Sequence, residues 1–223
     1  MSSRQRSWGV PAALVALSVI PVTAGTLRLI QLAGGPELIP ADSRFSSPLP
    51  LIIHIVSSAV FALVGAFQFA RRFRRRHHTW HRRAGRVLVV AGLLVVASAL
   101  WMTVFYAPEP GTGNLLYGFR LILTTGTATC LVLGFTAARR RDFTSHRAWM
   151  TRAYALALGA GTQAFTIGFG TAIFGTSDLV VDLSRIAAWV INLAVAELII
   201  RRTTRRPALP RAPAPSTAPQ VIT

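Results

Sequence analysis

The sequence contains no lysine, a single cysteine and only seven acidic residues, and charged residues make up 14% of its 223 positions. A soluble domain of ordinary composition carries roughly 25% charged residues. The lone Cys130 excludes an intramolecular disulfide and lacks the neighbouring ligands of a metal site, so we expect a buried, inert thiol. The sequence also has no glycine-rich phosphate loop, no serine–histidine–aspartate set and no paired carboxylates within an apolar stretch. The chemistry of classical soluble enzymes is therefore not expected.

Positive charge is abundant: all 24 basic residues are arginine, and the net charge is +17. A strongly basic chain can bind nucleic acid. Here, however, the arginines flank long apolar segments, where the positive-inside rule of membrane proteins explains them. We therefore predict no nucleic-acid partner.

Six apolar segments occur along the chain, each long enough to cross a hydrocarbon core ~30 Å thick. They cover residues 10–33, 48–70, 87–107, 115–138, 148–174 and 179–200. They predict an all-α, polytopic bundle of six transmembrane helices over residues 10–200. Residues 1–9 would form a cytoplasmic N-terminus, and residues 201–223 a disordered, basic and proline-rich cytoplasmic tail.

Two interpretations of the first segment remain open. It is a transmembrane helix kinked at Pro21, or residues 1–24 form a cleaved signal peptide, because Val22-Thr23-Ala24 resembles a small-x-small cleavage site.

The arginines indicate the orientation of the bundle. They gather in alternate connectors, at 71–86, 139–147 and 201–206, whereas the other three connectors contain only Arg44. Because basic connectors stay in the cytoplasm, both termini are predicted to be cytoplasmic.

Polar residues near the non-cytoplasmic face form a predicted outer group. Its members are Arg28, His54, Arg120, Asp182 and Arg185. Asp182 and Arg185 are three residues apart and are expected to pair. The remaining positive charge favours an anionic ligand or lipid headgroups. The alternative is that each arginine extends to the surface independently.

Two histidines mark the cytoplasmic face. His81 and His146 each begin a stripe of small residues, which lets membrane helices approach closely. If these two helices pack together, the imidazoles could ligate a haem iron, with nearby arginines such as Arg152 holding the propionates. They could equally bind a quinone headgroup or a metal, or simply bond to backbone and headgroups. Glu197 is expected to pair with Arg201, one turn later.

Three segments resemble a known family. They are Gly65-Ala66-Phe67-Gln68-Phe69, the run 81–86 (HRRAGR) and the run 146–155 (HRAWMTRAYA). Together they resemble the bacterial membrane proteins grouped as domain-of-unknown-function family 2306, over residues 50–200. The resemblance implies a multi-helix bundle in a bacterial cell membrane, with His54, His81 and His146 at recurring histidine positions. It implies no established reaction.

Three functions are compatible with these patterns. The first is a redox-type protein that binds haem b or a quinone through His54, His81, His146 and Arg152. The second is a permeation protein for small molecules or anions, using the outer arginine and histidine cluster of Arg28, His54, Arg120 and Arg185 together with the glycine-rich segment 148–174, which looks broken. The third is a non-catalytic membrane scaffold. Whether the protein is an enzyme, and its oligomeric state, remain open.

Overall fold

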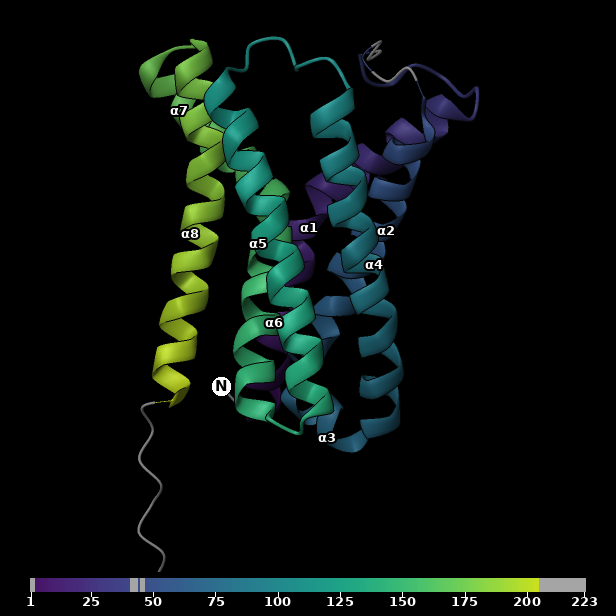
Figure 1. Cartoon of the computed structure of the whole chain (residues 1–223), viewed down its shortest axis with the longest axis vertical. Helices are drawn as coiled ribbons and strands as arrows, with labels where there is room; N and C mark the ends of the chain where they lie inside the picture. Colours follow the sequence, from purple (N-terminus) through teal and green to yellow (C-terminus); the bar gives the residue numbers. More distant parts are fainter. Residues whose placement is uncertain (1–2, 41–43, 45–46, 205–223) are drawn as a thin grey trace, which may run out of the picture.

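The structure is a computed structural model that describes residues 3–40, 44 and 47–204. This part of the chain contains eight helices joined by loops, and no strand occurs in it. They are α1 (Ser3–Leu32), α2 (Leu49–Gln68), α3 (Arg71–Arg76), α4 (His78–Phe105), α5 (Asn114–Arg139), α6 (Phe143–Ala157), α7 (Gly159–Phe174) and α8 (Asp178–Thr204). The long helices run along one axis as a single bundle (Figure 1). The predicted all-α fold is confirmed.

Five helices are long and apolar enough to cross a membrane: α1, α2, α4, α5 and α8. The pair α6 and α7 also passes this test together, but it is bent by 46° at Leu158, so the bundle has five spans, or six where this pair forms one broken span. Large apolar side chains are exposed on the outside, including Ile122 at 70% and Phe169 at 69%. Such a surface requires a lipid environment. The protein is therefore a polytopic membrane protein.

Some helix limits differ from the predicted ones. Helix α1 begins at Ser3, before the apolar segment that starts at residue 10. Helix α4 begins at His78 rather than at 87, because arginine favours helix and the basic turns extend the helix beyond the apolar stretch. The predicted tail is helical as far as Thr204, and its remainder lies outside the described residues.

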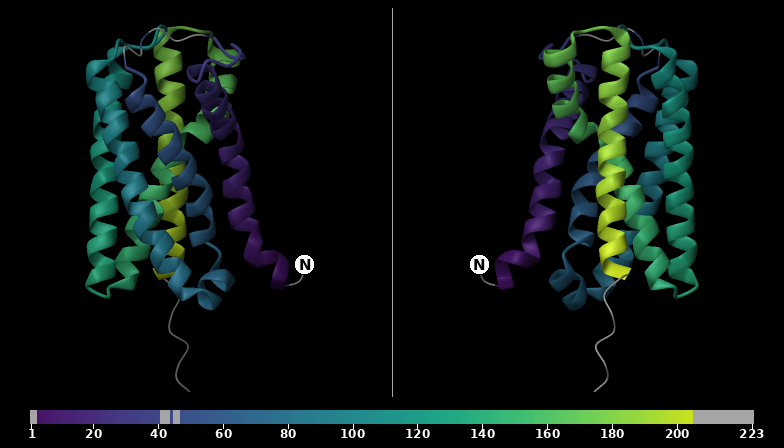
Figure 2. Two further views of the ribbon diagram at one scale, coloured as in Figure 1. Left: turned by 90° about the vertical axis from the view of Figure 1, so that its right-hand side faces the viewer. Right: turned by 90° about the vertical axis from the view of Figure 1, so that its left-hand side faces the viewer.

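The basic connectors lie together. Helix α3, the α5–α6 connection, the end of α8 and the N-terminus are all found at one end of the bundle, here named the basic end (Figures 1 and 2). The α1–α2, α4–α5 and α7–α8 loops lie at the opposite end. The alternation of arginine along the sequence thus becomes one charged end in space, as expected for a chain threaded back and forth through a bilayer.

The break in the fifth apolar segment occurs at Leu158 and is associated with two glycines. A Cβ on Gly159 would lie 1.9 Å from the indole nitrogen of Trp189, and one on Gly161 would lie 2.2 Å from the carbonyl oxygen of Leu17. The glycines therefore let α7 approach α8 and α1 closely. The broken appearance of this segment in the sequence is confirmed.

A polar residue on α8 compensates for the break. Asn192 donates from Nδ2 to the carbonyl oxygen of Ala155 (3.1 Å) and accepts from the hydroxyl of Thr162 (2.8 Å). In lipid, backbone groups at a helix break need partners within the protein. Asn192 thus connects both halves of the broken span to α8.

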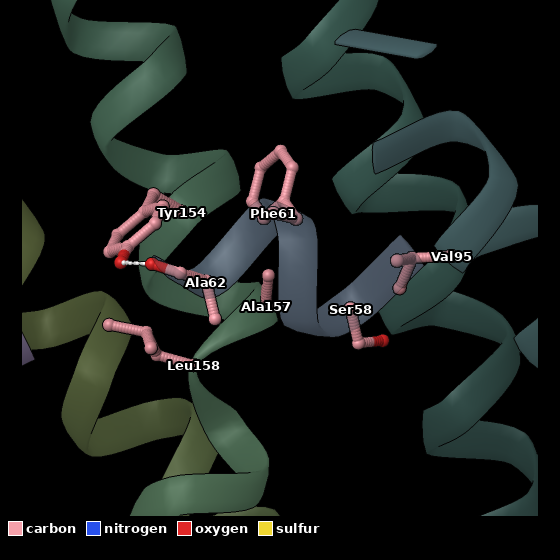
Figure 3. A pocket seen from close by; sticks show the side chains of 7 residues that line it. All are labelled: Ser58, Phe61, Ala62, Val95, Tyr154, Ala157 and Leu158. Carbon is pink, nitrogen blue, oxygen red and sulfur yellow. Dashed lines mark hydrogen bonds between the residues drawn. The ribbon is translucent and has the colours of Figure 1, made fainter. Parts of the chain in front are cut away.

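The core lies among α2, α4, α5 and α6. Phe61, Leu131 and Tyr154 are buried there with Cys130, whose predicted burial is confirmed. Gly92 of α4 faces both Phe61 and Leu131, with a virtual Cβ 2.8 Å from each side chain. A cavity of about 20 Å³ borders this core (Figure 3). That volume is room for about one water molecule.

Candidate functional site

The register of α2 against α4 places Gln68 and His81 at the same end of the bundle, the basic end. His54 on α2 bonds to Ser98 on α4, and Phe61 faces Gly92. Continuing this antiparallel pairing by two turns places Gln68, the last residue of α2, opposite Gly85, about one turn along α4 from His81.

Both residues have buried polar atoms that lack hydrogen bonds. Neither Oε1 nor Nε2 of Gln68 has a partner among the described residues, and neither does Nδ1 of His81. Most buried polar side-chain atoms in proteins are hydrogen-bonded, since an unmade bond costs free energy. Three such atoms at one end of a bundle indicate a place where a polar ligand can bind.

His146 lies at the same end. Its Nδ1 is 2.8 Å from the carbonyl oxygen of Gly134. A carbonyl only accepts, so Nδ1 carries the hydrogen, and Nε2 of the neutral ring keeps its lone pair. His146, Arg74 and His78 are close enough to His81 to interact with it electrostatically. The sequence-predicted histidine pair is therefore brought to one region of the basic end.

The two histidines do not meet in the way the small-residue stripes predict. Helix α4 packs mainly on α2 and α5, while α6 packs mainly on α5 and α8. Gly134 of α5 receives Met150 of α6, whose Cε would lie 2.8 Å from an added Cβ. Helix α5 therefore lies between α4 and α6 and packs against the small-residue stripe of each.

Arg152 contacts α8 rather than a cofactor position. Its Nε and Nη2 bond to the Glu197 carboxylate at 2.5 and 3.0 Å, and its guanidinium lies 4.7 Å from the Trp149 ring centre. Arg201, the partner expected from the sequence, also interacts electrostatically with Glu197. Two parallel bonds to a guanidinium hold a carboxylate better than one exposed pair along a helix, and Arg152 offers them.

The outer group divides into separate interactions. Arg28 donates to Oε1 of Gln31 (2.6 Å) and to the carbonyl oxygen of Pro40 (2.9 Å), and so holds the α1–α2 loop. His54 bonds to Ser98 (3.1 Å) and joins α2 to α4, many residues along α4 from His81.

The predicted pair between Asp182 and Arg185 is wrong. Asp182 is 1% exposed, and its carboxylate accepts from the backbone N–H groups of Gly113 and Leu116, both at 3.1 Å. These N–H groups open helix α5, where a carboxylate is stabilised by unpaired donors and by the helix dipole. A buried carboxylate gains more from these fixed donors than from a flexible neighbour on its own helix.

Glu109, which the sequence analysis treated only as part of a chain break, is the partner of the outer arginines. Its carboxylate accepts from both terminal nitrogens of Arg185 and, at 3.4 Å, from Arg120. The hydrogen bond from Arg185 lowers the pKa of the Glu109 carboxyl. The only available signal was an acidic loop residue at the same depth as two arginines.

Comparison with protein families gives one match. The model of the family described as predicted membrane protein, DUF2306, matches residues 51–200, from α2 to α8. The matched segment contains Gln68, His81 and His146. No curated protein and no solved structure matches the chain.

Proposed function

We propose, for a chain that belongs to the DUF2306 family of predicted membrane proteins, that the basic end binds the carbonyl-bearing headgroup of a lipid-soluble quinone. Gln68, His81 and His146 would contact the headgroup. The observation that carries this proposal is the set of buried, unpartnered atoms on Gln68 and His81.

The chemistry of these side chains suits a quinone. The amide of Gln68 offers two N–H donors and one acceptor, and a neutral imidazole offers one of each. Quinone carbonyls need donors, and the hydroxyls of the reduced form also need acceptors. A bound headgroup would thus remove desolvation penalties of about 1–3 kcal/mol per unpaired group.

In a redox role, this chain would supply the protons and a separate redox partner would supply the electrons. Interconversion of quinone and quinol moves two protons and two electrons. His81 and His146 would exchange the protons, because a neutral imidazole carries one nitrogen that can donate a proton and one that can accept it. The electrons would come from a redox partner. No cluster of three or more His, Cys, Asp or Glu that could hold a metal ion occurs in the described part of the chain.

Binding of decylubiquinone to the full chain in detergent tests this proposal. Quenching of tryptophan fluorescence should saturate with the wild type. Gln68→Leu and His81→Leu should each weaken binding by about tenfold, the effect of losing one or two hydrogen bonds. His78→Leu is the matched control, because His78 neighbours His81 in sequence but is exposed. Unsaturable quenching, or equal affinity in all four proteins, would refute the proposal.

Haem is a second candidate, supported by one observation. Histidines that bind a metal commonly donate their other N–H to a carbonyl, as His146 does to Gly134. Expression with added haem, followed by a reduced-minus-oxidised spectrum, distinguishes the candidates. A Soret band that is lost in His146→Leu and kept in Gln68→Leu supports haem. A colourless protein that binds decylubiquinone supports the quinone alone.

Anion permeation receives less support. Glu109 binds Arg120 and Arg185, and Arg28 is bound within its own loop, so the outer arginines are engaged with other groups of the chain. We further propose that the protein resides in a bacterial cell membrane with its basic end in the cytoplasm, following the positive-inside rule.

A further inference from the structure

A groove runs along the outside of α2 and α4. It has a volume of about 650 Å³, within the ~300–1,000 Å³ typical of small-molecule sites. Its walls include Val56 and Val60 of α2 and Val87 and Val90 of α4. Val56, Val87 and Val90 are 49%, 56% and 59% exposed, so the groove opens toward lipid. It shares no residue with the Gln68–His81 region.

The polar groups of the groove define what it can hold. Only two of its lining residues, Ser57 and Arg86, have polar side chains. The Ser57 hydroxyl donates to the carbonyl oxygen of Ile53, on its own helix, at 2.5 Å. The middle of the groove therefore offers no free hydrogen-bond donor and suits a hydrocarbon chain.

Arg86 places a positive charge at one end of the groove. It is exposed, it lies at the side of the groove nearer the basic end, and within the described residues no carboxylate pairs with it. Arg82 and Arg83, one turn nearer that end, are also exposed and add positive potential. Arg86 directly precedes the apolar stretch of α4, which is the depth of lipid headgroups.

We propose that this groove binds an anionic phospholipid, with one acyl chain between α2 and α4 and the phosphate on Arg86. The proposal is independent of quinone binding. A lipid without net negative charge would leave the positive charge of the guanidinium uncompensated, and a quinone headgroup would find only one polar contact. A second copy of the chain is the competing occupant.

Native mass spectrometry of the full chain tests the proposal, using mixed micelles that contain equal amounts of dioleoylphosphatidylglycerol and dioleoylphosphatidylcholine. The wild type should retain dioleoylphosphatidylglycerol preferentially. Arg86→Ala should reduce that preference about tenfold, as loss of a charge-assisted contact does. Arg83→Ala, an exposed arginine that does not line the groove, should keep it.

A second pair of variants tests the acyl chain. Val90→Trp would fill the groove and should reduce retention of both lipids, whereas Leu100→Trp, 41% exposed on the same helix but outside the groove, should not. Both positions are at the surface, so the fold should tolerate both changes. Equal lipid retention in Arg86→Ala and Arg83→Ala would overturn the proposal. So would a wild-type dimer that Val90→Trp dissociates without loss of lipid, because the groove would then hold a second copy.

Discussion

Tyr154 on α6 packs directly over Gly65 on α2, so closely that a Cβ on the glycine would lie 2.5 Å from the aromatic ring. The Tyr154 hydroxyl also donates to the carbonyl oxygen of Ala62 (2.6 Å), as Figure 3 shows. Two segments that carry the family resemblance, around residues 65–69 and 146–155, are therefore complementary surfaces. Their spacing in the sequence gives no hint that they touch.

We predict that Gly65→Ala lowers the thermal stability of the protein in detergent by about 1–3 kcal/mol, the usual cost of overpacking. Gly126→Ala on α5 is the control, since a Cβ there meets nothing within 4 Å. The control should be neutral or slightly stabilising, because alanine favours helix. Equal melting temperatures for the two variants would contradict the packing described.

Gln68→Leu should raise the melting temperature of the ligand-free protein while weakening quinone binding. Replacing a buried amide that lacks partners removes a penalty of about 1–3 kcal/mol. Differential scanning fluorimetry with and without decylubiquinone separates the two effects. A fall in stability without ligand would mean that the amide already has partners, and the binding proposal would lose its main support.

Asp182→Ala should destabilise the bundle by at least about 2 kcal/mol, because it removes the cap of α5 and leaves its backbone donors buried. Asp182→Asn, which keeps one acceptor oxygen, should lie between this variant and the wild type. Asp178→Ala, an exposed aspartate one turn earlier on α8, is the matched control. Thermal unfolding measures all three, and a loss as large in Asp178→Ala would contradict the capping role.

Acid should destabilise the α4–α5 loop through Glu109. Arg185 lowers the pKa of this carboxyl in the folded protein. The stabilisation is therefore complete above the ordinary carboxyl pKa and is lost as the pH falls through the lowered value. Glu109→Gln should flatten the acid limb of melting temperature against pH, whereas Glu37→Gln, an exposed carboxylate in the α1–α2 loop, should leave it unchanged. Identical profiles would rule out this linkage.

The sequence predicted the architecture well because hydropathy and arginine placement are local signals. Apolar length gave the spans, and the arginine-rich connectors gave the basic end. The sequence also predicted that His81 and His146 lie at the basic end. It did not predict that Asp182 caps α5, that Glu109 holds Arg120 and Arg185, or that Arg152 binds Glu197. Each of these contacts joins residues from different helices or loops, and their partners depend on helix register, which no single segment encodes.

The close approach of Gly161 to the Leu17 carbonyl extends beyond the segment matched by the family. Helix α1 packs against α7 and stabilises its bent position against the rest of the bundle. Cleavage after Ala24, as a signal peptidase would produce, would remove Leu17 and with it the contact between α1 and α7. Helix α7 would then pack mainly on α8 alone, and its glycine face would be exposed to lipid or to another protein.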